Sequence, residues 1–143
     1  MKRILVISGS RADAGLLEWP VKKLKEDGSF DVRLYKDWGM DVASAFQLVS
    51  SELSMFEPDL VLVLGDRYEI LAAATAAHLQ RIPIAHIGGG DVTEGSYDDA
   101  MRDAISRMAS IHFVTSTSAM ARLSHMGYRN VHLVGSPGID YIK

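Results

Sequence analysis

Short apolar runs rich in β-branched residues alternate with segments of helical periodicity along the whole chain. Six such runs are present, at residues 3–7, 31–35, 60–64, 83–87, 111–114 and 131–134. The run 60–64, Leu-Val-Leu-Val-Leu, is apolar at every position, which is typical of a strand covered on both faces in a parallel sheet. The pattern therefore favours an α/β fold with a largely parallel sheet.

The segments between these runs predict helices. They lie at residues 16–24, ending near Gly28, at 42–53, before Pro58, at 70–79, at 97–108, and at 118–126, before Gly127. Strands that alternate with helices form right-handed βαβ units. We therefore expect residues 1–143 to form one domain, a doubly wound, mostly parallel, six-stranded Rossmann-like sheet.

Composition excludes several classes of function. The chain has no cysteine, which excludes disulfide scaffolds, thiolate metal sites and cysteine nucleophiles. No apolar run approaches the roughly 18–20 residues that span a bilayer, and the run 4–7 is too short for the core of a signal peptide. The net charge of −3 and the lack of a basic block argue against nucleic-acid and membrane partners. We expect a cytoplasmic protein.

Unusual polar and glycine-rich segments follow four of the predicted strands. They are residues 8–15, 65–69, 88–95 and 135–138. Ligands of open α/β sheets bind beyond the carboxyl ends of the strands. These four segments are therefore where we expect the functional site.

The first segment, Ser-Gly-Ser-Arg-Ala-Asp-Ala-Gly, leads from a strand into a helix. Its amides and the helix dipole can hold an anion, with Arg11 adding charge, so we expect Ser10, Arg11 and Asp13 to contact substrate. The alternative is a plain turn in which Asp13 caps the helix. The segment is not a GxGxxG fingerprint, so it does not imply a dinucleotide cofactor.

The second segment places Asp66 and Arg67 directly after a fully apolar strand. A carboxylate and a guanidinium at this position must pair with a partner or face a cleft. We expect Asp66 to be catalytic and Arg67 to bind substrate. The alternative is that Asp66 caps the next helix and Arg67 is an ordinary surface residue.

The third segment combines three glycines with two acids. Gly89 and Gly90 allow close backbone approach to a ligand, and His86 lies at the end of the preceding strand. Asp91 and Glu94 bring two carboxylates into one loop, where different environments could divide acid and base roles. We expect acid/base chemistry or substrate positioning here, and no metal, because the spacing matches no dedicated metal motif.

The helix after this loop opens with Asp98, Asp99 and Arg102. Ser96 with Asp99 fits a capping box, and Asp98 with Arg102 fits an i,i+4 ion pair, so structural roles account for these residues. A catalytic role is the alternative. His112, on a strand face, is expected to be structural.

Taken together, these motifs resemble the N-terminal domain of the UDP-N-acetylglucosamine 2-epimerases, closest to the hydrolysing branch of sialic-acid and related sugar synthesis. The matching segments are 8–13 (SGSRAD), 58–69 (PDLVLVLGDRYE), 82–87 (IPIAHI), 89–95 (GGDVTEG), 98–105 (DDAMRDAI) and 134–140 (VGSPGID). The resemblance implies the N-terminal Rossmann-like half of a GT-B architecture. It also implies anti elimination of UDP from UDP-N-acetylglucosamine to a glycal, followed by water addition to give N-acetylmannosamine, without a cofactor.

By the same resemblance, Arg11 would contact the phosphates and Asp66 would be an essential carboxylate near the sugar. Asp98 or Asp99 would be an acid/base group, with Arg102 as a charge partner. These implied roles make Asp66, Asp91, Asp98, Asp99 and Arg102 the catalytic candidates of this sequence.

The chain also departs from the family pattern. Members usually carry His or Glu at the position of Gly88 and Glu at that of Asp91, and the region between Tyr35 and Pro58 is compressed. In the family a second domain of similar size binds most of the nucleotide and supplies a further catalytic His. We expect this half to come from elsewhere: a separate polypeptide, the remainder of a longer chain, or a second copy in a homodimer.

Two other functions remain open at this point. A degenerate half-domain could hold a nucleotide or sugar phosphate without turnover, which Gly88 and Asp91 favour. The same loops could also serve a hydrolase that acts on a smaller nucleotide, since fold does not determine function.

Overall fold

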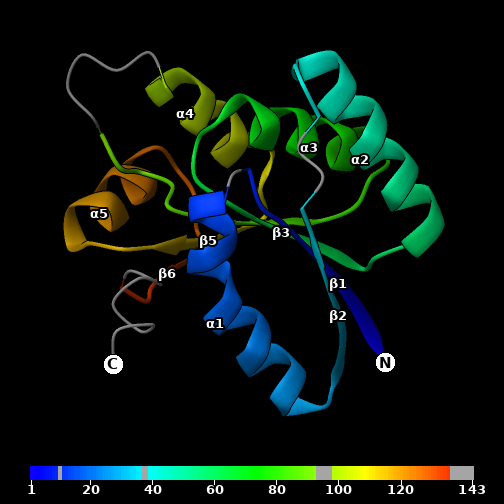
Figure 1. Ribbon diagram of the computed structural model, residues 1–143. Coiled ribbons are helices and arrows are strands. Elements are labelled where there is room, and N and C mark those ends of the chain that lie inside the picture. The colour runs from blue at the N-terminus through cyan, green and yellow to red at the C-terminus, as the bar shows by residue number, and fades with distance from the viewer. Residues whose placement is uncertain (10, 37–38, 93–97, 136–143) are drawn as a thin grey trace.

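Six parallel strands form one sheet in the order β2-β1-β3-β4-β5-β6 (Figure 1). The strands are β1 (Lys2–Ile7), β2 (Phe30–Tyr35), β3 (Leu60–Leu64), β4 (Ile84–Ile87), β5 (Ile111–Val114) and β6 (Val131–Leu133). The computed structural model describes residues 1–9, 11–36, 39–92 and 98–135, with the backbone alone at residues 11–13 and 98. Each strand begins and ends within one residue of its predicted run, and the predicted fold class is confirmed.

Five helices connect the strands. They are α1 (Arg11–Asp27), α2 (Val42–Phe56), α3 (Tyr68–Leu79), α4 (Asp98–Met108) and α5 (Thr117–His125). Helix α1 lies on one face of the sheet, and α2, α3 and α4 lie on the other (Figure 1). The sheet is therefore doubly wound, as the alternating sequence pattern predicts.

Successive residues of β1 show why its sequence is apolar at adjacent positions. Leu5 packs with α2 and α3, whereas Val6 packs with Leu17 and Val21 of α1 on the opposite face. Both strand residues are fully buried. A strand covered on both faces needs an apolar side chain at every position rather than at every second one.

The direction of winding changes between β1 and β3. The chain leaves β1 through α1 to the edge strand β2, then returns through α2 to β3 on the other side of β1. A crevice at such a topological switch point, outside the carboxyl ends of the strands, is the usual ligand site of this fold class. The carboxyl ends of β1 and β3, just before Ser8 and Gly65, lie side by side at this switch point.

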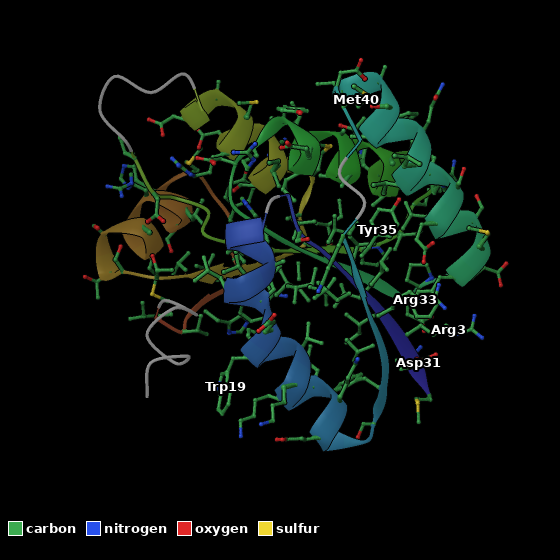
Figure 2. All side chains as sticks on the ribbon, viewed as in Figure 1. Arg3, Trp19, Asp31, Arg33, Tyr35 and Met40 are labelled. Atoms are coloured by element: carbon green, nitrogen blue, oxygen red, sulfur yellow. The ribbon has the colours of Figure 1, made fainter. Side chains whose placement is uncertain are left out.

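Two arginines of β1 and β2 form contacts with the end of α2. Arg3 donates to the carbonyl of Phe56 at 2.9 Å, and Arg33 forms an ion pair with Glu52 at 2.7 Å. Both guanidinium groups lie over the Phe56 ring, with centroid distances of 5.8 and 4.4 Å, and Figure 2 labels both arginines. These charges attach the end of α2 to β1 and β2, so they have structural partners.

Helix α2 has a reciprocal cap at its start. The Asp41 carboxylate accepts from the backbone amide of Ser44 at 2.8 Å, and the Ser44 hydroxyl accepts from the amide of Asp41 at 3.0 Å. The hydrogen bond from the Ser44 amide, with that from its hydroxyl, lowers the pKa of the Asp41 carboxyl. The cap sets the start of α2 on the path from β2 toward the switch point.

None of the helices in the described part of the chain is both long and apolar enough to span a bilayer.

Candidate active site

Arg102 is the centre of a charged cluster at the carboxyl edge of the sheet. It extends from α4, and its side chain is only 8% exposed. The guanidinium donates to the Asp66 carboxylate, which follows β3, to the Asp99 carboxylate on its own helix, and at 2.6 Å to the backbone carbonyl of Asp91. One cation thus joins three segments that the sequence analysis selected separately.

The two carboxylates of this cluster are partly accessible. The Asp66 side chain is 22% exposed and that of Asp99 is 29% exposed, whereas the arginine beneath them is buried. A guanidinium and a carboxylate form strong, charge-assisted hydrogen bonds. The cluster therefore presents two partly exposed carboxylates over a buried counter-charge.

The structure excludes one of the two roles expected for Asp66, that of a helix cap. Helix α3 begins after Arg67, and no side chain caps its first turn. Asp66 is therefore not the cap of α3, and its carboxylate turns to Arg102 instead. Arg67 is half exposed and binds the buried Glu69 carboxylate through two hydrogen bonds of 3.1 and 3.2 Å.

Arg102 forms an ion pair with Asp99, an i,i+3 partner on α4. The i,i+4 pair of Arg102 with Asp98 that the sequence pattern predicts stays a prediction. Both spacings bring side chains together on a helix, so periodicity alone does not separate them. The side chain of Asp98 lies outside the described residues, as do those of Arg11 and Asp13; Ser10 and Glu94 lie outside them entirely.

The glycine loop after β4 is packed tightly between helices α4 and α5. A Cβ atom at Gly89 would lie 2.6 Å from the Ser106 hydroxyl, and one at Gly90 would lie 2.5 Å from the Ala119 carbonyl oxygen. Arg122 on α5 also donates to the carbonyl of Gly90. Gly89 and Gly90 thus allow α4 and α5 to pack closely against this loop. The sequence analysis proposed another use of these glycines, the close approach of the backbone to a ligand.

This packing positions the Asp91 side chain beside the cluster. One carboxylate oxygen of Asp91 accepts from the Thr115 hydroxyl at 3.5 Å, and the carbonyl of Asp91 accepts from Arg102. The third acid of the site is thus held by Thr115, which follows β5, and by Arg102 of α4. Gly88 stands where members of the family that the sequence resembles usually carry His or Glu. It has a φ of +97°, a conformation that residues with a side chain disfavour.

Replacement of Gly90 by alanine is expected to lower the free energy of unfolding by about 2 kcal/mol or more, because Gly90 combines a φ of +79° with the backbone contact of Ala119. Urea unfolding monitored by circular dichroism would measure this loss. Gly127→Ala is the matched control, since its φ is +96° but no atom lies within 4 Å of the place that its Cβ would occupy. Equal losses in the two variants would contradict the role of the close contact.

His86 lies beneath this loop and is completely buried. Its Nε2 is 2.7 Å from the carbonyl oxygen of Gly65, and its Nδ1 is 3.0 Å from the hydroxyl of Ser106. Burial lowers the pKa of His86 to about 4, so the ring is neutral near pH 7. Both ring nitrogens bind protein groups, so His86 supports the site from below.

Three residues of this region were not selected from the sequence: Ser106, Thr115 and Arg122. Ser106 follows Arg102 by four positions, so helical spacing places both on one face of α4. Thr115 directly follows β5, at the same edge of the sheet as the other candidates. Arg122 lacks such a signal, because its contact depends on how α5 packs against the loop.

In the described part of the chain, no three histidine or acidic side chains are grouped as a metal site requires.

Comparison with known proteins agrees with the motifs. A family profile described as UDP-N-acetylglucosamine 2-epimerase matches residues 20–143. The chain belongs to the UDP-N-acetylglucosamine 2-epimerase family. It is 32% identical to a UDP-N,N'-diacetylbacillosamine 2-epimerase (hydrolyzing) of Legionella pneumophila, covering 99% of this chain and 48% of that protein. It is 30% identical to a UDP-N-acetylglucosamine 2-epimerase of Neisseria meningitidis, covering 98% and 46%.

Solved structures of this epimerase family have the same fold. A Staphylococcus aureus MnaA structure with UDP superposes with a TM-score of 0.91 at 22% identity, covering 99% of this chain and 46% of that one. A Neisseria meningitidis UDP-GlcNAc 2-epimerase bound to UDP-GlcNAc gives 0.85 at 21% identity, covering 95% and 46%. The chain spans about half the length of the epimerases it matches.

The alignments with these epimerases are longer than the chain. The Legionella epimerase aligns over 181 positions and the Neisseria enzyme over 176, against 143 residues here. These two relatives therefore carry insertions that this member of the family lacks. The Campylobacter jejuni relative aligns over 101 positions that cover 69% of the chain, at 39% identity, so that stretch aligns with few gaps.

Proposed function

We propose that this chain supplies the carboxylate-bearing half of the active site of a hydrolysing UDP-sugar 2-epimerase. The substrate is UDP-N-acetylglucosamine or a related UDP-sugar. The observation that carries the proposal is the cluster in which buried Arg102 binds Asp66 and Asp99 beside the Asp91 loop. This cluster lies at the edge of the sheet where α/β folds bind ligands.

The proposed reaction divides into two balanced steps. In the first, a base accepts the C2 proton of the sugar, the C1–O bond breaks, and UDP leaves with the bonding electrons to give a glycal. In the second, water adds across the glycal, its oxygen at C1 and a proton at C2 on the other face, to give N-acetylmannosamine. The chemistry therefore needs a group that accepts a proton and a group that returns one.

The cluster fits these needs. A carboxylate can accept a proton, and Arg102 holds the carboxylates of both Asp66 and Asp99 in place. Asp91 is held by a different contact, the hydrogen bond from the Thr115 hydroxyl. It is the nearby carboxyl group for the role of returning a proton. Two acids in unlike environments can divide the tasks of base and acid. The proposed contact of Arg11 with the phosphates places the leaving group near the end of β1.

The relatives support the choice of ligand. Solved epimerases of this fold are described with UDP and with UDP-GlcNAc, and the Legionella relative is described as hydrolyzing. Because those proteins are about twice as long as this chain, we propose that the nucleotide side of the cleft comes from outside these 143 residues: from the remainder of a longer chain, a separate polypeptide or a second copy.

Asp66→Asn is expected to reduce the release of UDP from UDP-N-acetylglucosamine by at least about 100-fold, since the amide cannot accept the proton. The assay follows UDP and N-acetylmannosamine together, with purified chain alone and at concentrations that favour self-association. Asp103→Asn is the matched control, because Asp103 is an exposed acid on α4 and loses the same charge. Equal activity of the Asp66 variant and the wild type would refute the proposed role.

One observation favours a second candidate function, a binding module without turnover. Gly88 offers no side chain at a position where family members usually carry His or Glu. Calorimetry with UDP-N-acetylglucosamine distinguishes the two functions. Binding by a wild-type chain that forms neither product would favour the module and reject the enzyme.

A further inference from the structure

A buried chain of hydrogen bonds connects α4 to the end of β3 beneath the charged cluster. The Ser106 hydroxyl lies 3.0 Å from Nδ1 of His86, and Nε2 of His86 lies 2.7 Å from the carbonyl oxygen of Gly65. Both side chains are fully buried, with 0% exposure. The chain thus ends at the residue immediately before Asp66.

The direction of each hydrogen bond follows from its partners. A carbonyl oxygen only accepts, so Nε2 of His86 carries the hydrogen and donates it to Gly65. Burial keeps the ring neutral at pH 7, so Nδ1 has a lone pair and accepts from the Ser106 hydroxyl. The Gly65 carbonyl therefore sets the Nε2–H tautomer of His86, and the Ser106 hydroxyl holds the ring in place by donating to Nδ1.

Helix α4 consequently reaches the end of β3 by two routes. Arg102 and Ser106 are four residues apart, which places them on the same face of α4. Arg102 binds the Asp66 carboxylate directly, whereas Ser106 acts through His86 on the carbonyl just before it. Two attachments from one rigid helix determine both the position and the direction of the Asp66 side chain.

Two hydrogen bonds hold the backbone of the Gly65 turn. The Gly65 amide donates to the carbonyl of Ile87 at 2.9 Å, and its carbonyl accepts from His86. Gly65 has a φ of +90°, a conformation that side chains disfavour. These hydrogen bonds restrain the backbone at the point from which Asp66 extends.

We propose that Ser106 and His86 are positioning residues, which hold the Gly65–Asp66 turn so that the Asp66 carboxylate meets Arg102 and the substrate in the reactive geometry. This inference rests on the proposed epimerase function and assigns roles to two residues beneath the reacting groups. A displacement of about 1 Å at a reacting group can cost about 100-fold in rate. A serine far from the substrate can therefore control turnover.

The test compares Ser106→Ala, Ser106→Thr and the control Ser110→Ala in the full chain. Ser110 is an exposed serine just after α4. Three measurements are made: kcat and KM for UDP-N-acetylglucosamine, the ¹⁵N shifts of the His86 ring, and amide hydrogen exchange at Gly65. The Val61 amide, at the other end of β3, serves as the internal reference for global unfolding, since it donates to Pro83 at 2.9 Å.

For Ser106→Ala we expect kcat to fall by about tenfold with KM within about twofold of the wild type, as a transition-state misalignment would give. Exchange at Gly65 is expected to accelerate by about tenfold more than at Val61. Ser106→Thr keeps the hydroxyl and should restore both values, and wild-type His86 should show the Nε2–H tautomer.

Equal acceleration of exchange at Gly65 and Val61, with kcat unchanged, would overturn the proposal and leave Ser106 a purely stabilising residue. An Nδ1–H tautomer of His86 in the wild type would also overturn it. If the wild-type chain forms no product, the proposed function fails, while the exchange and ring measurements still decide whether Ser106 and His86 position the turn.

Discussion

Arg102→Met is expected to destabilise the fold by about 3 kcal/mol and to reduce turnover of UDP-N-acetylglucosamine by at least about 100-fold. Its side chain is 8% exposed and neutralises two carboxylates at once. Removing one partner of a buried ion pair leaves the other charge without compensation, which costs several kcal/mol. Asp66 and Asp99 would then repel each other, and the Asp91 carbonyl would lose its donor.

Urea unfolding and the UDP-release assay measure the two effects separately. Arg107→Met is the matched control, because Arg107 lies on the same helix and is exposed. Arg102→Lys tests the geometry, since an ammonium group retains the charge but lacks the planar fork that reaches two carboxylates and a carbonyl. Stability and activity of Arg102→Met equal to those of the control would contradict the central role of this cluster.

The sequence predicts the sheet well because burial imposes a simple pattern on it. Residues 60–64 are apolar at every position, and β3 is buried on both faces along almost its whole length. Helix boundaries follow from local signals such as Gly28 and Pro58, which act within one turn of the chain. The strand order β2-β1-β3-β4-β5-β6 is not predicted by these patterns, because right-handed crossovers are compatible with more than one doubly wound order.

The site could be predicted as a place but not as a set of contacts. Asp66 and Arg102 are separated by 36 positions. Asp66 follows the carboxyl end of β3, and Arg102 lies near the start of the helix that follows β4, so the topology places both at the carboxyl edge of the sheet. The contact of Arg102 with Asp99 depends on the rotation of α4 about its axis, which the sequence pattern does not determine.

Burial of polar groups was the least predictable feature. The position of His86 at the end of a strand suggests a side chain that contacts substrate. In the structure it lies under Gly89 and forms a hydrogen bond with Ser106. His112 is also buried, beside His86 on the adjacent strand, in agreement with the structural role that its position on a strand face predicts. Tertiary packing, which single-sequence patterns do not contain, determines which polar groups reach the solvent.

The buried histidine gives a second large effect, a loss of stability at mildly acidic pH. Burial lowers the pKa of His86 to about 4 from its ordinary value of 6.5. Between these values the unfolded chain binds a proton that the folded chain does not, so the free energy of unfolding falls as the pH falls. The loss reaches about 3 kcal/mol near pH 4 and then levels off. Burial lowers the pKa of His112 as well, which adds to the loss in the same direction.

Urea unfolding at a series of pH values from 7 to 4 measures this slope, and His86→Gln should reduce it because glutamine does not titrate. His78→Gln is the control, since His78 is exposed on α3. The lowered pKa of Asp41 places the loss of its contribution below about pH 4, outside this window. A slope that is equal in His86→Gln and in the control would show that His86 is not held neutral in the fold. It would also remove the basis for a neutral His86 ring whose Nδ1 accepts from the Ser106 hydroxyl.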